Sequence, residues 1–257
     1  MTSETSPAVT DRVVVITGGG QGIGRAYAHH FAENGAIPVI ADIDGENGAR
    51  VAAEIEAAGG RALAVQTDVT SPDSVAAMVA ATLAAHGRLD VLINNAAIFV
   101  TLGRRPFEEI PLDEWRRVMD VNITGCFICA SAVIPVMRQA GWGRIINISS
   151  STVPLGIPHF LHYVTSKSAL IGMSRAMARE VGGDGITVNA VLPGMIETEI
   201  ENRGRTDAGR QHVIGNQSLQ RQQTPEDMVG TVLFLASPAS AFMTGQSICV
   251  DGGAAFV

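Results

Sequence analysis

Short apolar runs alternate along the chain with longer segments whose apolar residues recur at helical spacing. This alternation is typical of a parallel sheet with helices on both faces. We therefore predict a single-domain, doubly wound α/β fold with a seven-stranded parallel sheet. The expected strands are residues 13–16, 38–41, 62–66, 91–93, 144–148, 187–191 and 247–250. The expected helices are residues 22–34, 46–58, 72–86, 112–140, 162–181 and 225–236.

Three segments depart from this regular pattern. Residues 1–10 are polar and are expected to form a flexible tail before one domain of residues 11–257. Pro38 falls in an interior strand, where it would remove a ladder hydrogen bond, so we expect it at the first residue of the strand or at a bulge. The stretch of about 195–223 is rich in Gly, Asn, Gln and Arg from residue 197 on, and it predicts a mobile substrate loop.

Composition narrows the class of protein. The net charge of −7 argues against a nucleic-acid partner, and three cysteines without a secretory signal indicate a cytoplasmic protein. Cys126 and Cys129 form a C-x-x-C within an apolar helix, where core packing is favoured over metal or redox chemistry, and we predict no metal site. Uncharged stretches 145–166 and 229–250 could span a bilayer by length, but Ser, Thr, Gly and Pro interrupt them, so we expect no membrane partner.

A glycine-rich turn, residues 17–24, lies between the first expected strand and helix. In this position glycines permit close approach of a pyrophosphate to the helix N-terminus, where backbone N–H groups are open. Asp42 ends the second expected strand, where a carboxylate can hydrogen-bond the adenosine ribose. The alternative for Asp42 is a cap or turn residue.

The chain has a single lysine, Lys167, four residues after Tyr163, one of its two tyrosines. On a helix these two side chains share a face, so the ammonium is expected to lower the pKa of the phenol. Such a tyrosine suits general acid/base catalysis near neutral pH. The alternative is an exposed helix pair without a role.

Taken together, the motifs resemble those of the classical short-chain dehydrogenase/reductase family, from about residue 11 to the C-terminus, which implies a Rossmann fold. The matching residues are Thr17-Gly18-x-x-x-Gly22-x-Gly24, Asp68-Val69, Asn94-Asn95-Ala96, Asn122, Ser150, Tyr163-x-x-x-Lys167, Pro193-Gly194 and Thr198. One departure is Ala97, where the family usually has Gly and where a methyl group is expected to crowd the turn slightly.

The resemblance implies hydride transfer between a nicotinamide and a carbonyl carbon or secondary alcohol. It makes Tyr163 the proton-transfer residue, Ser150 the group that positions the substrate oxygen, Lys167 a ligand of the nicotinamide ribose, and Asn122 a residue that steadies the helix and a proton-relaying water. The implied cofactor contacts are Gly18, Gln21, Gly22, Ile23, Gly24, Asp42, Ile43, Asp68, Val69, Asn95, Ala96, Tyr163, Lys167, Pro193, Gly194, Ile196 and Thr198.

The cofactor is expected to be NAD(H), because Asp42 would repel a 2′-phosphate and Gln21 supplies no positive charge. The expected pocket is apolar and suits an aryl, alicyclic or medium-chain alcohol or ketone. Its residues, besides Ser150, are Phe99, Val153, Leu155, Phe160 and Met195. Arg104 and Arg105 could meet a carboxylate, and His159 or His162 could reach the substrate, although ordinary loop and capping roles fit as well.

Two other functions remain open. A reductase of carrier-bound 3-oxoacyl groups is disfavoured by Gly141 and Asp184, where such relatives usually present arginines. A catalytically silent dinucleotide sensor is disfavoured by the complete set of catalytic-type residues.

Surplus apolar residues predict an oligomer. The helices 112–140 and 162–181 carry more than one apolar stripe: Phe127, Ile128, Val133, Met137, Ile171, Met173 and Met177. Together with the apolar C-terminus, residues 254–257, they favour a homotetramer with two kinds of two-fold contact. A dimer whose tail covers its own pocket is the alternative.

Overall fold

The chain folds around one parallel sheet, and the computed structural model describes residues 9–200 and 206–256. The strands lie in the order β3-β2-β1-β4-β5-β6-β7, and every neighbouring pair is parallel. They are β1 (Val13–Thr17), β2 (Ile37–Asp42), β3 (Leu63–Gln66), β4 (Val91–Asn94), β5 (Gly143–Ile148), β6 (Ile186–Pro193) and β7 (Ser247–Val250). The predicted fold is confirmed, and each predicted strand end lies within two residues of the observed one.

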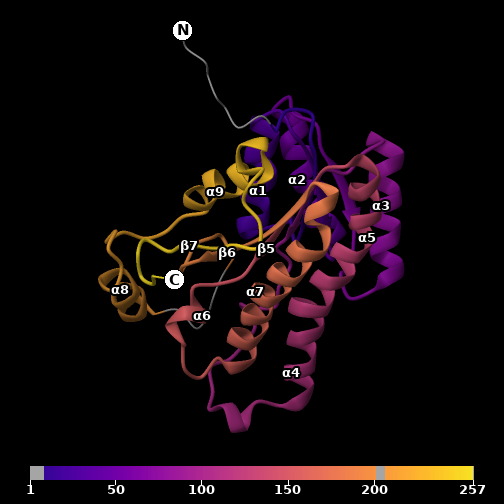
Figure 1. Cartoon of the computed structure of the whole chain (residues 1–257). Coiled ribbons are helices and arrows are strands. Elements are labelled where there is room, and N and C mark those ends of the chain that lie inside the picture. The colour runs from indigo at the N-terminus through magenta and orange to yellow at the C-terminus, as the bar shows by residue number, and fades with distance from the viewer. Residues whose placement is uncertain (1–8, 201–205, 257) are drawn as a thin grey trace.

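Helices cover both faces of the sheet (Figure 1). One face carries α1 (Gly22–Glu33), α2 (Gly45–Ala57) and α9 (Glu226–Ala236). The other carries α3 (Pro72–His86), α5 (Gly125–Ala140) and α7 (Leu161–Val181). Strand order reverses between β1 and β4, so their carboxyl ends border the crevice where open α/β sheets bind ligands.

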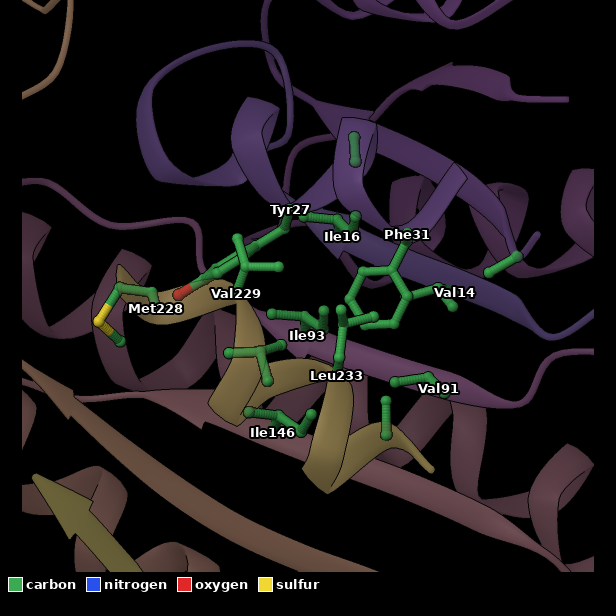
Figure 2. Close-up of a cluster of buried hydrophobic side chains, with 14 of the residues drawn as sticks. Val14, Ile16, Tyr27, Phe31, Val91, Ile93, Ile146, Met228, Val229 and Leu233 are labelled. Carbon is green, nitrogen blue, oxygen red and sulfur yellow. The ribbon is translucent and has the colours of Figure 1, made fainter. Parts of the chain in front are cut away.

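Two hydrophobic cores, one on each face, hold the layers together. Because side chains alternate along a strand, Val14 and Ile16 of β1 face one core while Val13 and Val15 face the other. Figure 2 shows the first of these cores, in which the buried Phe31 of α1 and residues of α9 pack over β1, β4 and β5. Burial on both faces explains why the central strands read as continuous apolar runs rather than alternating ones.

Pro38 is the second residue of β2 and pairs with Val14 without a bulge, so both predicted placements are wrong. The amide of Ile37 donates to Arg12 O on the β1 side. Successive residues point their amides to opposite sides, so the position of the Pro38 nitrogen faces β3. Pairing with β3 begins only at Val39, and the missing N–H therefore costs no ladder bond.

The expected helix 112–140 is continuous but contains a π-helical turn. It comprises α4 (Leu112–Met119), the π turn η2 (Asp120–Thr124) and α5. By length and composition it is the one helix in the described ranges that could cross a membrane. Its residues Cys129, Ala130 and Val133 are buried against the sheet, as in the core helix of a globular domain, and the predicted core packing of the C-x-x-C is confirmed. The uncharged stretches 145–166 and 229–250 are each divided among a strand and helices.

The structure describes only part of the two segments that were expected to be flexible. Residues 1–8 lie outside the described residues, and Val9, within the segment 1–10, is fully buried. Residues 197–223 contain a helix that the sequence pattern did not predict, α8 (Asp207–Gly215), whose N-cap Thr206 accepts a hydrogen bond from Gly209 N and which has no buried residue. Gln217 and Leu219 then bond the backbone of Asp251 and Gly252. The mobility of this segment stays a prediction, and residues 201–205 lie outside the described ranges.

Candidate active site

The glycine-rich turn folds tightly against the end of β4. Gly18 and Gly22 have positive φ angles of 63° and 58°, which favour glycine. A Cβ on Gly18 would lie 2.9 Å from Ala96 Cα, and one on Gly24 would overlap the Gly18 carbonyl oxygen. These residues thus have no room for a side chain, and the turn delivers the N-terminus of α1 to the crevice.

Thr17 and Asn95 fasten this turn to the sheet. Asn95 Nδ2 donates to the carbonyl oxygens of Thr17 and Gly18, both at 3.0 Å. Thr17 Oγ1 accepts from Asn95 N at 3.0 Å and Ala96 N at 3.1 Å. The amide of Asn95 is therefore engaged with backbone, and Thr17, not predicted as a site residue, is equally involved. Ala97 is exposed, and crowding of the cofactor by its methyl group stays a prediction.

Asp42 connects the end of β2 to the same turn. Its Oδ2 accepts from Gly20 N at 2.8 Å, and its Oδ1 accepts from Asp44 N at 3.0 Å. The cap of α2 is Asp44 rather than Asp42. Asp42 is buried, whereas the neighbouring Ile43 is 67% exposed at the rim. At the end of β2, Asp42 thus provides a carboxylate and Ile43 provides an adjacent apolar surface.

Glu199 lies over the N-terminus of α1, although its sequence position gave no indication of this. Its Oε1 accepts from Gly22 N at 2.9 Å. The adjacent Ile200 covers the same glycine, because a Cβ on Gly22 would lie 2.7 Å from Ile200 Cδ1. A carboxylate of this chain therefore uses one of the amides at which an anion would bind.

Other predicted cofactor residues have structural contacts in the protein alone. Asp68 Oδ1 accepts from Thr70 N and Oγ1, and Val69 is buried against α5. Pro193 ends β6, and the amide of Gly194 donates to Val250 O. Ile196 belongs to the hydrophobic core and bridges to Gln223, and Thr198 Oγ1 accepts from Ile200 N. Of these residues, Thr198 lies close to Gly22 at the start of α1.

Ser150, Tyr163 and Lys167 come together beyond the end of β5. All three are buried, and the side chains of Ser150 and Tyr163 share a hydrogen bond. Lys167 Nζ lies 5.7 Å from the Tyr163 ring centroid and donates to Ile148 O at 2.7 Å. Ser149 instead donates to Lys167 O. Of these two serines, Ser150 is the one that meets Tyr163, as expected from its distance along the chain.

Burial dominates the electrostatics of this group. It raises the pKa of Tyr163 to about 12, and the hydrogen bond from Ser150 offsets only part of this increase. Burial also lowers the pKa of Lys167 to about 8. The prediction that Lys167 lowers the pKa of Tyr163 is therefore wrong for the protein alone. Tyr163 is a protonated phenol at neutral pH, ready to donate a proton.

Asn122 projects from the π turn and joins two segments of the site. Its Oδ1 accepts from Ile98 N at 2.8 Å, and its Nδ2 donates to Ile98 O at 3.2 Å and Ser166 Oγ at 3.0 Å. Ser166 Oγ in turn donates to Tyr163 O. The fully buried amide thus ties the segment after β4 to the helix that carries Tyr163 and Lys167. π turns inside α-helices are frequent at functional sites.

An aromatic wall flanks the Tyr163 hydroxyl. The ring centroids of Phe99 and Phe160 lie 5.0 Å and 4.9 Å from that of Tyr163 and 5.8 Å from each other. Val153 and Leu155 belong to the short helix α6 (Thr152–Leu155), which the sequence pattern did not predict. Leu155 is 44% exposed, and Val153 and Met195 are half-buried. The predicted substrate residues therefore comprise the buried Phe160, three half-buried residues and the exposed Leu155; the half-buried ones are Phe99, Val153 and Met195.

Charged residues border this wall. His162 is fully buried beside Tyr163, with Nε2 3.3 Å from Glu114 Oε1, and Arg105 Nη2 lies 3.5 Å from Glu114 Oε2. His159 is exposed, with a positive φ of 61°. The guanidinium of Arg104 lies over the Phe160 ring, 5.6 Å from its centroid. Of these residues, Arg105 pairs with Glu114, whereas the ring nitrogens of the buried His162 make no hydrogen bond to the described residues.

The crevice fits a dinucleotide. The glycines at the start of α1 contribute no side chains of their own, and Glu199 and Ile200 are the groups that lie over Gly22. Asp42 lies at the end of β2, and Tyr163 and Lys167 lie further along the same edge. The residues that would hold such a cofactor come from the carboxyl ends of β1, β2, β4, β5 and β6. Among the described residues, no group of three or more His, Cys, Asp or Glu could hold a metal ion.

Known proteins share this arrangement along nearly the whole chain. Residues 18–255 match the family described as enoyl-(acyl carrier protein) reductase. A 3-oxoacyl-[acyl-carrier-protein] reductase from Synechocystis sp. is 39% identical, with 96% of this chain and 98% of the relative covered. A cis-4-hydroxycyclohexanecarboxylate dehydrogenase from Sinomonas cyclohexanicum is 38% identical, with 96% and 97% covered. A solved 7α-hydroxysteroid dehydrogenase, complexed with NADH and 7-oxo glycochenodeoxycholic acid, has a TM-score of 0.92 and 32% identity over 98% of both chains.

Proposed function

Because this chain belongs to the classical short-chain dehydrogenase/reductase family of oxidoreductases, we propose that it uses NAD(H) to interconvert a secondary alcohol and a ketone. The observation that carries the proposal is the buried Tyr163 hydroxyl, hydrogen-bonded to Ser150 and close to Lys167. When bound, a nicotinamide ring accepts or supplies the hydride. Proton transfer and positioning of the substrate oxygen are carried out by side chains of this protein.

Tyr163 transfers the proton. In ketone reduction its hydroxyl donates to the substrate oxygen, which matches the protonated state that burial imposes. In alcohol oxidation the phenolate takes the hydroxyl proton as the carbinol carbon gives up its hydride. Ser150 hydrogen-bonds the same oxygen and fixes its distance to Tyr163. Lys167, with its pKa lowered to about 8, is charged or neutral over the working pH range and can pass a proton onward.

NAD(H) is favoured over NADP(H) by Asp42. Its carboxylate accepts from the Gly20 amide and stands at the end of β2, where the ribose of a dinucleotide lies in such folds. A 2′-phosphate there would meet a buried negative charge. NADH is the cofactor named for the solved 7α-hydroxysteroid dehydrogenase. The ratio of kcat/KM for the two cofactors tests this, and a preference for NADP(H) contradicts it.

An apolar alcohol or ketone suits the wall formed by Phe99 and Phe160. The relative from Sinomonas cyclohexanicum is named for cis-4-hydroxycyclohexanecarboxylate, which supports an alicyclic substrate. Initial rates with cyclohexanol, 1-phenylethanol, 2-octanol and their ketones test this class. A protein that binds NAD(H) but turns over none of the six compounds, no carboxylate-bearing analogue of them and no carrier-bound 3-oxoacyl group would be a sensor rather than this enzyme.

A carrier-dependent 3-oxoacyl reductase is the second candidate, because the relative from Synechocystis sp. has that name. Asp184, one of the positions where an acidic carrier would need a cation, pairs with Arg138 at 2.7 Å. The other position, Gly141, is the left-handed end of α5 and offers no side chain. Turnover of a carrier-bound 3-oxoacyl group well above that of the ketones would favour this candidate.

We also propose a cytoplasmic homotetramer. Phe127 on α5 is 55% exposed and Phe256 is 88% exposed, and both are side chains that an interface would bury. Light scattering at low micromolar concentration distinguishes the possibilities. A dimer would leave α5 as the interface and remove the proposed role of residues 254–257, whereas a monomer would contradict the assembly altogether.

A further inference from the structure

Arg104 is a solvent-exposed cation at the end of the aromatic wall. Within residues 9–200 and 206–256 no carboxylate pairs with it, and its one recorded contact is the Phe160 ring. The adjacent Arg105 differs, because its guanidinium faces Glu114 and its amide donates to His159 O at 3.0 Å. The two neighbouring arginines therefore differ: Arg105 anchors the loop, whereas the exposed guanidinium of Arg104 contacts the wall at Phe160.

The position of Arg104 relative to the reacting group is constrained by ring contacts. Its guanidinium carbon is 5.6 Å from the centroid of Phe160, which is 4.9 Å from that of Tyr163. The guanidinium carbon of Arg104 therefore lies no further from the Tyr163 ring centroid than the sum of these two distances. A six-membered ring lying along the wall, with its oxygen at Tyr163, would extend its far substituent toward Arg104.

The loop that carries Arg104 is fastened on both sides. Asn122 holds both backbone groups of Ile98, and the amide of Arg105 bonds His159 O. A guanidinium presented from a fixed backbone loses less entropy on binding than one on a loose loop. Its planar fork matches a carboxylate through two parallel N–H···O bonds.

We propose that Arg104 binds a carboxylate of the substrate, so that the enzyme acts on hydroxy or oxo acids whose acid group lies across a carbocyclic or aryl scaffold from the reacting carbon. This inference rests on the proposed alcohol–ketone chemistry at Tyr163. Arg104 adds recognition of a negative charge to a wall that otherwise favours apolar substrates. Arg104 is a specificity residue and takes no part in proton transfer.

Matched alcohols that differ only in the acid group test the inference. The pairs are cyclohexanol with cis-4-hydroxycyclohexanecarboxylate, and 1-phenylethanol with 4-(1-hydroxyethyl)benzoate. The measured quantity is the ratio of kcat/KM for acid over neutral alcohol in each protein. In the wild type it should exceed one for at least one pair. In Arg104→Gln it should fall by about 10- to 100-fold, the value of a charge-assisted hydrogen bond, mainly through KM. Arg104→Lys should give an intermediate ratio.

Arg179→Gln is the matched control, because Arg179 is an exposed arginine in the last turn of α7, remote from Tyr163. It should keep the wild-type ratio. An unchanged ratio in Arg104→Gln, or a wild-type preference for the neutral member of both pairs, overturns the role of Arg104 while leaving the alcohol–ketone chemistry intact. Failure of all four alcohols to reduce NAD⁺ or NADP⁺ overturns the proposed function itself, and the inference with it.

Discussion

Replacing Asn122 with alanine should both destabilise the protein and misplace its substrate wall. The side chain makes three hydrogen bonds, two to the backbone of Ile98 and one to Ser166. Each intramolecular hydrogen bond contributes about 1 kcal/mol net, so their loss should lower the free energy of unfolding by about 3 kcal/mol. The cavity left by a fully buried amide adds to this cost.

Asn189→Ala provides a control with a similar cost away from the site. Asn189 is also a buried asparagine that bonds backbone, with Nδ2 donating to Met243 O at 2.9 Å and Oδ1 accepting from Gln246 N at 3.0 Å. These partners precede β7, at the amino ends of the strands, opposite Tyr163. Loss of two hydrogen bonds should cost about 2 kcal/mol and leave the substrate wall in place.

Urea unfolding at one fixed protein concentration measures the stability of both variants, and initial rates measure their activity. Asn122→Ala should also raise the KM for the alcohol and lower kcat, each about tenfold, because Phe99 follows the released Ile98. Asn189→Ala should keep both kinetic constants near the wild-type values. A loss of stability below about 1 kcal/mol in Asn122→Ala, or equal kinetic losses in the two variants, would refute the positioning role.

Three further predictions concern the reacting groups. Tyr163→Phe should lower kcat by about 10²–10⁴-fold, since it removes only the proton-transfer hydroxyl. Titration with NADH should show an unchanged cofactor affinity in this variant. Near-normal turnover would contradict the mechanism. Glu199→Gln should tighten NADH binding about two- to fivefold, because it removes a carboxylate from the N-terminus of α1. The control Glu197→Gln should leave NADH binding unchanged. Weaker NADH binding in Glu199→Gln would show instead that Glu199 assists the cofactor. Because the pKa of Lys167 is lowered to about 8 from its ordinary 10.5, the unfolded chain holds the extra proton between these values. The contribution of Lys167 to the free energy of unfolding of the cofactor-free protein should therefore rise with pH across this window, while the buried Cys126 and Cys129, whose pKa values are raised, act in the opposite direction. The slope of the free energy of unfolding against pH should therefore be more positive in the wild type than in Lys167→Met; equal slopes refute the shift.

The sequence predicted the strands well because their residues are buried on both faces. Such strands appear as uninterrupted apolar runs, and turns rich in Gly, Asp and Asn separate them. The helix of residues 72–86 was predicted without error, because Ser71 caps its start, Pro72 occupies its first turn and Gly87 ends it in the left-handed conformation. For the strands and for this helix, the residues that determine the element are close together in the sequence.

Features that depend on distant residues were not predictable in this way. Glu199 contacts Gly22 across most of the chain, and neither residue carries a local sign of the contact. The π turn at Asn122 follows from bonds to Ile98 and Ser166, which the helical pattern cannot register. The electrostatic prediction for Tyr163 was wrong for a related reason. Spacing gave the neighbouring charge but not the depth of burial, and burial has the larger effect on this pKa.

The solitary lysine makes this protein a natural subject for amine chemistry. Acylating reagents and amine cross-linkers have one side-chain target, Lys167, besides the α-amino group at the chain terminus. Its pKa near 8 leaves a large neutral, nucleophilic fraction at mildly alkaline pH, while its burial restricts access to small reagents. Covalent labelling of this single position would therefore report directly on occupancy of the crevice, without background from surface lysines.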